Sequence, residues 1–234
     1  MIQSLITWNE QSYGWYLDAS AYSGFHKALA QIIVPHLKPY DTLCDIGCGL
    51  GRLDLELAPY VSEILAVDIS EYAIGVLSRD VERAGVKNVR ARQGATEDLE
   101  GVFDIILMSL YGSPDMPMLL EHCRRKIIRI VSAGKKSGLY PERHRREVKF
   151  NVPNVQDDLT ALKIGYTLEF CSLEFGQPLR TWQDAESFIL NNAPDASKDE
   201  INDFLNEKIE RTDRPDFPFY LPYQKELGIF IIDK

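Results

Sequence analysis

The spacing of apolar residues along the chain predicts an alternation of buried strands and amphipathic helices. Short strand-forming runs that are rich in apolar residues are typical of strands in a largely parallel sheet. The expected strands are residues 42–46, 64–67, 88–92, 103–108, 126–131, 167–175 and 227–232. Apolar residues three or four positions apart predict a helix over residues 21–36, ahead of the first strand. Strands that alternate with helices predict an α/β fold.

Capping residues mark where several further helices begin. Ser70 is the expected N-cap of a helix after the second strand, and Asn154 of one before the sixth. Thr181 and Ser197 each precede an acidic residue by three positions, which is the pattern of a capping box, and predict two short helices. Prolines interrupt residues 213–223, which are therefore an expected loop.

The most specific local feature is the run LCDIGCGLG at residues 43–51, where an apolar strand leads into Gly47, Gly49 and Gly51. Glycine has no Cβ and tolerates positive φ, so the backbone can approach a ligand closely at the carboxyl end of the strand. Asp45 brings a carboxylate to the same place. The dinucleotide fingerprint G-x-G-x-x-G is not matched, and an acid here would repel a pyrophosphate but suit a cationic ligand. A structural glycine turn and a dinucleotide site are the alternatives.

A second acid, Asp68, ends the expected second strand 17 positions after Gly51. That separation is close to the length at which a βαβ unit returns to the same crevice. A carboxylate there can accept two hydrogen bonds from a ribose diol. The alternative role for Asp68 is to cap the helix that follows Ile69-Ser70.

With Asp45-Ile-Gly-Cys-Gly-Leu-Gly51 and Asp68, the chain resembles the class I S-adenosylmethionine-dependent methyltransferases. The resemblance implies a Rossmann-like α/β fold, with a seven-stranded, mainly parallel sheet, an antiparallel last strand and helices on both faces. It implies S-adenosyl-L-methionine as the cofactor. The implied cofactor-binding residues are Asp45, Gly47, Cys48, Gly49, Gly51, Asp68, Ile69, Thr96, Glu97 and Met108. This sequence departs from the family at Ala95, where an acid commonly holds the adenine amino group, so Glu97 or a backbone group must serve.

The same resemblance divides a single domain, residues 1–234, into four parts. Residues 1–36 are an aromatic, helical lid, residues 37–175 the cofactor-binding core, residues 176–222 a helical insertion and residues 223–234 the last strand. Two interpretations apply to the aromatic residues of the N-terminal segment: they close over the cofactor, or they pack on the core. These residues are Trp8, Tyr13, Trp15 and Tyr16.

The loop after the fourth strand, residues 109–114, commonly borders the methyl acceptor in the resembling family. It lacks the Asn/Asp-Pro-Pro-aromatic motif of enzymes that methylate nucleic-acid amino groups, and no Pro-Cys pair offers a nucleophile for carbon-5 base methylation. The expected activity is therefore methyl transfer to a small molecule by in-line displacement. A base is needed for a hydroxyl or a protonated amine. The candidates for that base are Tyr13, Tyr16, His26, Tyr111 and His144.

Charge is distributed unevenly along the chain. The formal net charge is −9, yet residues 124–149 contain ten Lys or Arg and two Glu, a net +8. Most such runs are solvated faces. The alternative is an anionic acceptor bound by Arg143, Arg145 or Arg146, with Tyr111 nearby. Nucleic acid is a rival substrate that the overall acidity disfavours. A non-catalytic cofactor-binding scaffold is a second rival, because a fold alone does not establish catalysis.

The bulk properties point to a cytoplasmic protein. The N-terminus lacks the basic start and apolar core of a signal peptide, and no apolar run approaches the roughly 20 residues that span a bilayer. Four cysteines do not form a disulfide framework at this length, and four scattered histidines give little support for a metal site. The expected partner is a small-molecule acceptor, without a metal or a membrane.

Overall fold

The computed structural model describes residues 10–112, 115–134, 138–145 and 147–234. The chain divides into two compact units. The sheet unit comprises residues 26–133, 149–171 and 226–234; the accessory unit comprises residues 1–25, 134–148 and 172–225, so far as they are described. No helix among the described residues is both long and apolar enough to cross a membrane.

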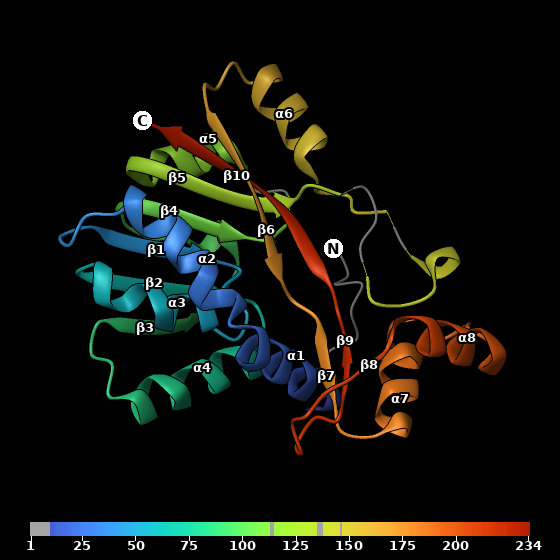
Figure 1. Cartoon of the computed structure of the whole chain (residues 1–234). Coiled ribbons are helices and arrows are strands. Elements are labelled where there is room, and N and C mark those ends of the chain that lie inside the picture. Colours follow the sequence, from blue (N-terminus) through green and yellow to red (C-terminus); the bar gives the residue numbers. More distant parts are fainter. Residues whose placement is uncertain (1–9, 113–114, 135–137, 146) are drawn as a thin grey trace. The chain divides into compact units, whose positions relative to one another are not determined.

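A seven-stranded sheet is the centre of the sheet unit (Figure 1), with the order β3-β2-β1-β4-β5-β10-β6. The strands are β1 (Thr42–Ile46), β2 (Glu63–Asp68), β3 (Val89–Gln93), β4 (Phe103–Ser109), β5 (Cys123–Ser132), β6 (Thr167–Glu174) and β10 (Gln224–Asp233). Strands β1 to β5 pair in parallel, and β10 pairs antiparallel with β5. The expected fold class, including the antiparallel last strand, is confirmed.

Helices flank both faces of this sheet, with α2 and α3 in front and α5 behind in the view of Figure 1. The helices are α2 (Phe25–Ile33), α3 (Arg52–Leu57), α4 (Glu71–Ala84), α5 (Met116–Glu121) and α6 (Val152–Ala161), with 3-10 turns η1 (Val34–His36), η2 (Ala58–Tyr60) and η3 (Thr96–Asp98). Ser70 caps α4 as expected, since its hydroxyl accepts from the Ala73 amide, and Gly85 ends that helix at φ 68°. The caps fix the directions in which α4 and its neighbours leave the sheet.

The core of the sheet unit lies between the parallel strands and the helices. Its buried residues come from every central strand and include Cys44, Ile46, Ile106, Met108, Ile127 and Phe230. Burying each large apolar side chain contributes about 1.5–3 kcal/mol before entropy is counted. This packed core therefore holds the carboxyl ends of β1, β2 and β4 in fixed positions relative to one another.

The described residues of the accessory unit form three α-helices, one 3-10 turn and a small sheet. Its elements are α1 (Glu10–Ser23), η4 (Glu142–His144), β7 (Gln177–Leu179), α7 (Trp182–Asn192), α8 (Lys198–Lys208), β8 (Glu210–Arg211) and β9 (Phe219–Leu221). The small sheet has the order β7-β9-β8. Thr181 caps α7, and Ser197 forms a capping box with Glu200 on α8, as the sequence predicted. Trp15, Leu179, Ile189, Leu205 and Leu221 meet in a core of their own.

The structure corrects three expectations. The helix expected over residues 21–36 is two helices separated at Gly24, and the first already begins at Glu10. Asn154 was the wrong cap for α6: Asn151 caps it, and its side chain accepts from the Asn154 amide. The expected loop 213–223 contains β9, which pairs with β7 and β8. The division of the chain into lid, core and insertion stays a prediction, although residues 10–25 belong with residues 172–225 in one unit.

Candidate functional site

The glycine turn lies between β1 and α3 in the sheet unit. Gly47, Gly49 and Gly51 all have left-handed φ values, of 74°, 54° and 64°. A Cβ at Gly47 would lie 2.1 Å from the Tyr111 ring, and one at Gly51 would lie 2.2 Å from Leu77. A Cβ at Gly49 would meet no described atom within 4 Å. The missing side chains at Gly47 and Gly51 therefore leave room for Tyr111 and Leu77. Gly49 faces open space in which a ligand can approach the backbone.

Asp68 ends β2 beside this turn. Its Oδ2 accepts from the Gly49 amide at 2.9 Å, and its Oδ1 accepts from the Ser70 amide at 2.8 Å. Each carboxylate oxygen has a second lone pair. Asp68 therefore holds the glycine turn and retains acceptor capacity for a pair of hydroxyl groups. The two roles considered for it, ligand binding and helix capping, do not exclude each other.

Asp45 is buried, and the structure places Asp54 of α3 beside it. Asp54 was not among the candidates because nothing in its local sequence marks it out. Burial raises the pKa of both carboxyl groups, and the charges of Asp54 and Asp68 raise that of Asp45 further. Asp45 Oδ1 and both carboxylate oxygens of Asp54 lack a hydrogen-bond partner among the described residues. A proton retained by this pair lowers the cost of burying two carboxyl groups together.

Tyr111 and Thr96 connect two loops at the carboxyl end of the sheet. Their hydroxyl oxygens lie 2.7 Å apart, and either can donate. The buried guanidinium of Arg129 donates to the Gly112 carbonyl at 3.1 Å, which anchors the loop that carries Tyr111. Arg129 belongs to the basic run, yet only 1% of it is exposed. Its role is to position this loop.

The remaining expected cofactor residues differ in accessibility. Ile69 is 76% exposed and Glu97 is also exposed, whereas Met108 is fully buried in the core. Met108 can therefore contact a ligand only through its backbone atoms. Burial and neighbouring carboxylates raise the pKa of the Cys48 thiol, so it remains neutral at the turn.

The five candidate bases are divided between the units. His26 and Tyr111 belong to the sheet unit, and Tyr13, Tyr16 and His144 to the accessory unit. Only Tyr111 is in contact with the glycine turn in the sheet unit as described. His144 lies 3.6 Å from Glu200 and accepts from Arg143. The assignment of any of these residues as a catalytic base stays a prediction.

Most described members of the basic run have specific partners. Arg143 forms an ion pair with Glu200 at 2.6 Å, and Arg145 donates to the Tyr140 carbonyl at 3.0 Å. Arg125 pairs with Asp41, and Lys126 with Asp233. Arg146 and Trp8 lie outside the described residues. Among the described residues, no cluster of His, Cys, Asp or Glu has the arrangement of a metal site.

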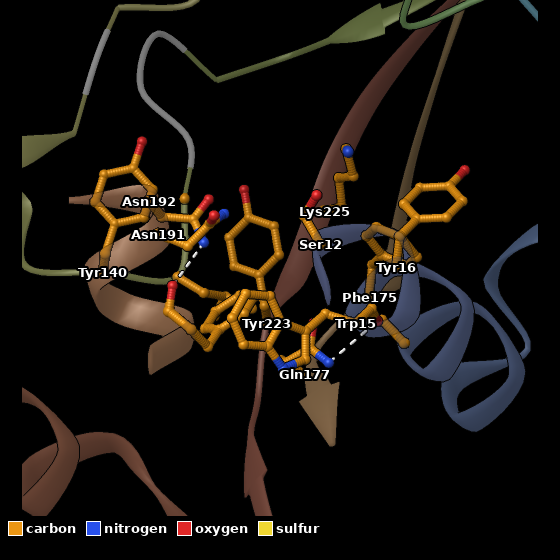
Figure 2. Close-up of a pocket in the computed structure, with 14 residues that line it drawn as sticks. Ser12, Trp15, Tyr16, Tyr140, Phe175, Gln177, Asn191, Asn192, Tyr223 and Lys225 are labelled. Atoms are coloured by element: carbon orange, nitrogen blue, oxygen red, sulfur yellow. Dashed lines mark hydrogen bonds between the residues drawn. The ribbon is translucent and has the colours of Figure 1, made fainter. Parts of the chain in front are cut away.

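A pocket of about 210 Å³ lies in the accessory unit (Figure 2). Its aromatic walls consist of Trp15, Tyr16, Tyr140, Phe175, Phe188 and Tyr223. Among the described residues that line it, Lys225 is the one that carries a charge. Sequence reasoning missed this pocket, because its residues are dispersed over more than 200 positions and share no motif. Trp15 is packed there edge-on against Phe188, so core packing accounts for it; closure of the N-terminal segment over a cofactor stays a prediction.

Known proteins resemble this chain over its central part. A family described as "methyltransferase domain" matches residues 37–207. A probable cobalt-precorrin-6B C(15)-methyltransferase (decarboxylating) of Methanococcus maripaludis is 31% identical over 97 residues, which are 41% of this chain and 54% of that protein. The uncharacterized methyltransferase YcgJ of Bacillus subtilis is 42% identical over 65 residues, 26% of each chain. The chain thus spans about half the length of the first relative and a quarter of the second.

The crystal structure of YcgJ from Bacillus subtilis shares the fold. It superposes with a TM-score of 0.57 at 18% identity, covering 88% of this chain and 97% of that one. The family match covers more than half of the chain and includes the glycine turn, Asp68 and the loop of Tyr111. The chain therefore belongs to the class I S-adenosylmethionine-dependent methyltransferases.

Proposed function

We propose that the protein transfers a methyl group from S-adenosyl-L-methionine to a small-molecule acceptor. The observation that carries the proposal is the glycine turn, which is open at Gly49 and held by Asp68 at the carboxyl ends of β1 and β2. Parallel α/β sheets bind their ligands at this edge. The family to which the chain belongs uses this cofactor.

The residues of the site fit the cofactor in three respects. The backbone at Gly49 has room for a close approach, and the free lone pairs of Asp68 suit the two hydroxyls of a ribose. The buried acids Asp45 and Asp54 lie beneath the turn and give it a negative potential, which suits a ligand with an amine and a sulfonium. On the adenine side, Thr96 is fixed by Tyr111, and the exposed Glu97 is free to turn toward a ligand.

Held by the Gly49 backbone and Asp68, the cofactor would supply an electrophilic methyl group on a sulfonium leaving group. The protein's contribution is to align the acceptor and to exclude water. The Tyr111 ring covers Gly47, and its hydroxyl is held by Thr96, so Tyr111 is a fixed wall of the site and not a mobile side chain. A proton lost by a hydroxyl or amine acceptor passes to a base or to solvent.

A small-molecule acceptor is favoured by two observations. The cobalt-precorrin relative is named for a reaction on a small molecule. Among the described residues of the basic run, Arg143 is paired with Glu200 and Arg125 with Asp41, so these two charges are less available to bind the phosphates of a nucleic acid.

Calorimetry with S-adenosylmethionine and with its demethylated product tests this function. We expect both to bind in the micromolar range, and mass spectrometry of the purified protein to identify either one as a retained ligand. Binding of a nicotinamide dinucleotide in the absence of any heat with these two compounds would contradict the proposal. Binding without turnover of any acceptor in a small-molecule panel would favour the non-catalytic scaffold. Binding of RNA with a steep, log-linear dependence on salt would favour the nucleic-acid alternative.

A further inference from the structure

The pocket of the accessory unit combines aromatic walls with one cationic group. In Figure 2 the hydroxyls of Tyr140 and Tyr223 and the amine of Lys225 point toward the same side, while Trp15 and Gln177 lie on the opposite side. The Gln177 amide donates to the Trp15 and Pro178 carbonyls at 3.1 and 3.0 Å. The Gln177 amide is therefore used in hydrogen bonds that hold the pocket wall. Lys225 carries a positive charge at the pocket.

Lys225 has no counter-ion among the described residues. Its Nζ lies 5.1 Å from the centre of the Phe175 ring and 5.9 Å from that of Phe25. Cation–π contacts of this kind only partly replace the water lost from an ammonium group. This desolvation lowers the pKa of Lys225 to about 8. An anion placed beside the amine would restore the missing stabilisation.

Three other described arginines of the accessory unit do not offer the pocket a free charge. Arg143 is neutralised by Glu200, and Arg180 by Asp18 at 2.6 Å. Arg214 lies over the Tyr22 ring, outside the pocket. Lys225 is thus the cation that lines the pocket and lacks an acidic partner in the part of the chain that the structure describes.

We propose that this pocket is a binding site for a planar molecule of one or two rings whose carboxylate pairs with Lys225. This inference is independent of the proposed methyl transfer. Aromatic walls favour stacked or edge-on packing of a flat ring, and an ammonium–carboxylate pair shielded by them is a strong charge-assisted contact. The cavity, at about 210 Å³, is smaller than the ~300–1,000 Å³ sites that hold drug-sized ligands, which limits the size of the ring system.

A matched pair of probes tests the ligand class directly. 2-Naphthoate and 2-naphthamide have the same rings and differ in charge. Calorimetry and quenching of tryptophan fluorescence should show that the full-length protein binds the naphthoate at least about tenfold more tightly. Lys225→Met keeps the apolar stem and removes the charge, so it should bring both probes to equal affinity. Lys208→Met is the control: Lys208 is exposed, pairs with Glu207 and does not line the pocket, and the variant should keep the preference.

The pH dependence gives a second readout that does not require a variant. Naphthoate affinity should be constant at neutral pH and fall as Lys225 loses its proton above about pH 8, whereas naphthamide affinity should not change there. The other ionisable side chains that line the pocket are Tyr16, Tyr140 and Tyr223, and phenols ionise near pH 10 in general.

Three outcomes overturn the inference: neither probe binds, both bind equally to the natural protein, or Lys225→Met retains the preference. Loss of the preference in Arg143→Gln but not in Lys225→Met would assign the anion to the basic run instead. Calorimetry with S-adenosylmethionine on the same samples keeps the two proposals apart. If the cofactor does not bind but the naphthoate behaves as expected, the methyltransferase function fails and the ligand class of the pocket stands.

Discussion

The hydroxyl oxygens of Thr96 and Tyr111 lie 2.7 Å apart although 15 positions separate them in the chain. Thr96 begins the turn after β3, and Tyr111 belongs to the loop after β4, whose Gly112 carbonyl is held by Arg129. The Tyr111 ring also covers Gly47. One tyrosine therefore connects three of the loops that surround the proposed cofactor site, and its loss should affect all of them.

Tyr111→Phe should weaken S-adenosylmethionine binding while leaving the fold intact, because the ring stays in place over Gly47 and only the hydroxyl is lost. A hydrogen bond of this kind contributes about 0.5–1.5 kcal/mol. Thr96→Val should have a similar effect, and the double variant should be no worse than either single one. Additive losses in calorimetry would show that the two hydroxyls act separately.

Gly49→Ala should abolish or greatly weaken cofactor binding. Gly49 and Gly85 form a matched pair, since both have positive φ and a Cβ at either would meet no described atom within 4 Å. Each substitution should lower the free energy of unfolding by roughly 1–2 kcal/mol through backbone strain. Only the methyl group at position 49 would enter the space where the ligand approaches. Equal cofactor affinities of the two variants, measured by calorimetry, would place the ligand elsewhere.

Asp68→Ala should weaken S-adenosylmethionine binding by about 1–3 kcal/mol, the cost of losing charge-assisted hydrogen bonds. Part of this loss is expected to be indirect, because Asp68 also holds the Gly49 and Ser70 amides. Asp68→Asn separates the two effects, since the amide oxygen can still accept one of the backbone bonds. Glu71→Gln, at an exposed carboxylate in the first turn of α4, is the control. Unchanged affinity in Asp68→Ala would contradict the assignment of the ribose site.

Asp54→Asn should stabilise the protein, and increasingly so as the pH rises. The folded-state pKa values of the buried pair lie above those of an unfolded aspartate, so the folded chain retains protons that the unfolded chain has released. Stability contributed by this protonated pair is present at acidic pH and is lost as the pH rises through the raised values. The gain at pH 8 should be roughly 1–3 kcal/mol in urea unfolding.

Glu56→Gln, on the same helix, is the control for this prediction, and it should not reproduce the gain in stability at pH 8. If Asp54→Asn destabilises the protein equally at pH 5 and pH 8, the two carboxyl groups do not share a proton. Because the pair lies beneath the glycine turn, a cationic ligand should lower these pKa values, and cofactor binding should release protons.

Features that depend on neighbours within a few positions could be predicted from the amino-acid sequence alone. A strand that ends in alternate glycines, followed by a second strand that ends in an acid, specifies a βαβ unit and its ligand edge, and the structure has β1, the turn and β2 where the pattern predicts them. The caps at Ser70, Thr181 and Ser197 were equally local, because a cap satisfies amides only two or three positions away. The family followed from these motifs.

Contacts between side chains that are far apart in the chain could be identified only from the folded structure. Helix α1 lacks a regular apolar stripe, because its aromatic residues face neighbours on several sides, so periodicity did not find it. Asp54 looks like an ordinary polar residue of a helix until the fold buries it against Asp45. The desolvated Lys225 and its aromatic surroundings come from segments between Ser12 and Lys225. Burial and long-range pairing set the charge states of these groups, and neither is encoded in the spacing of nearby residues.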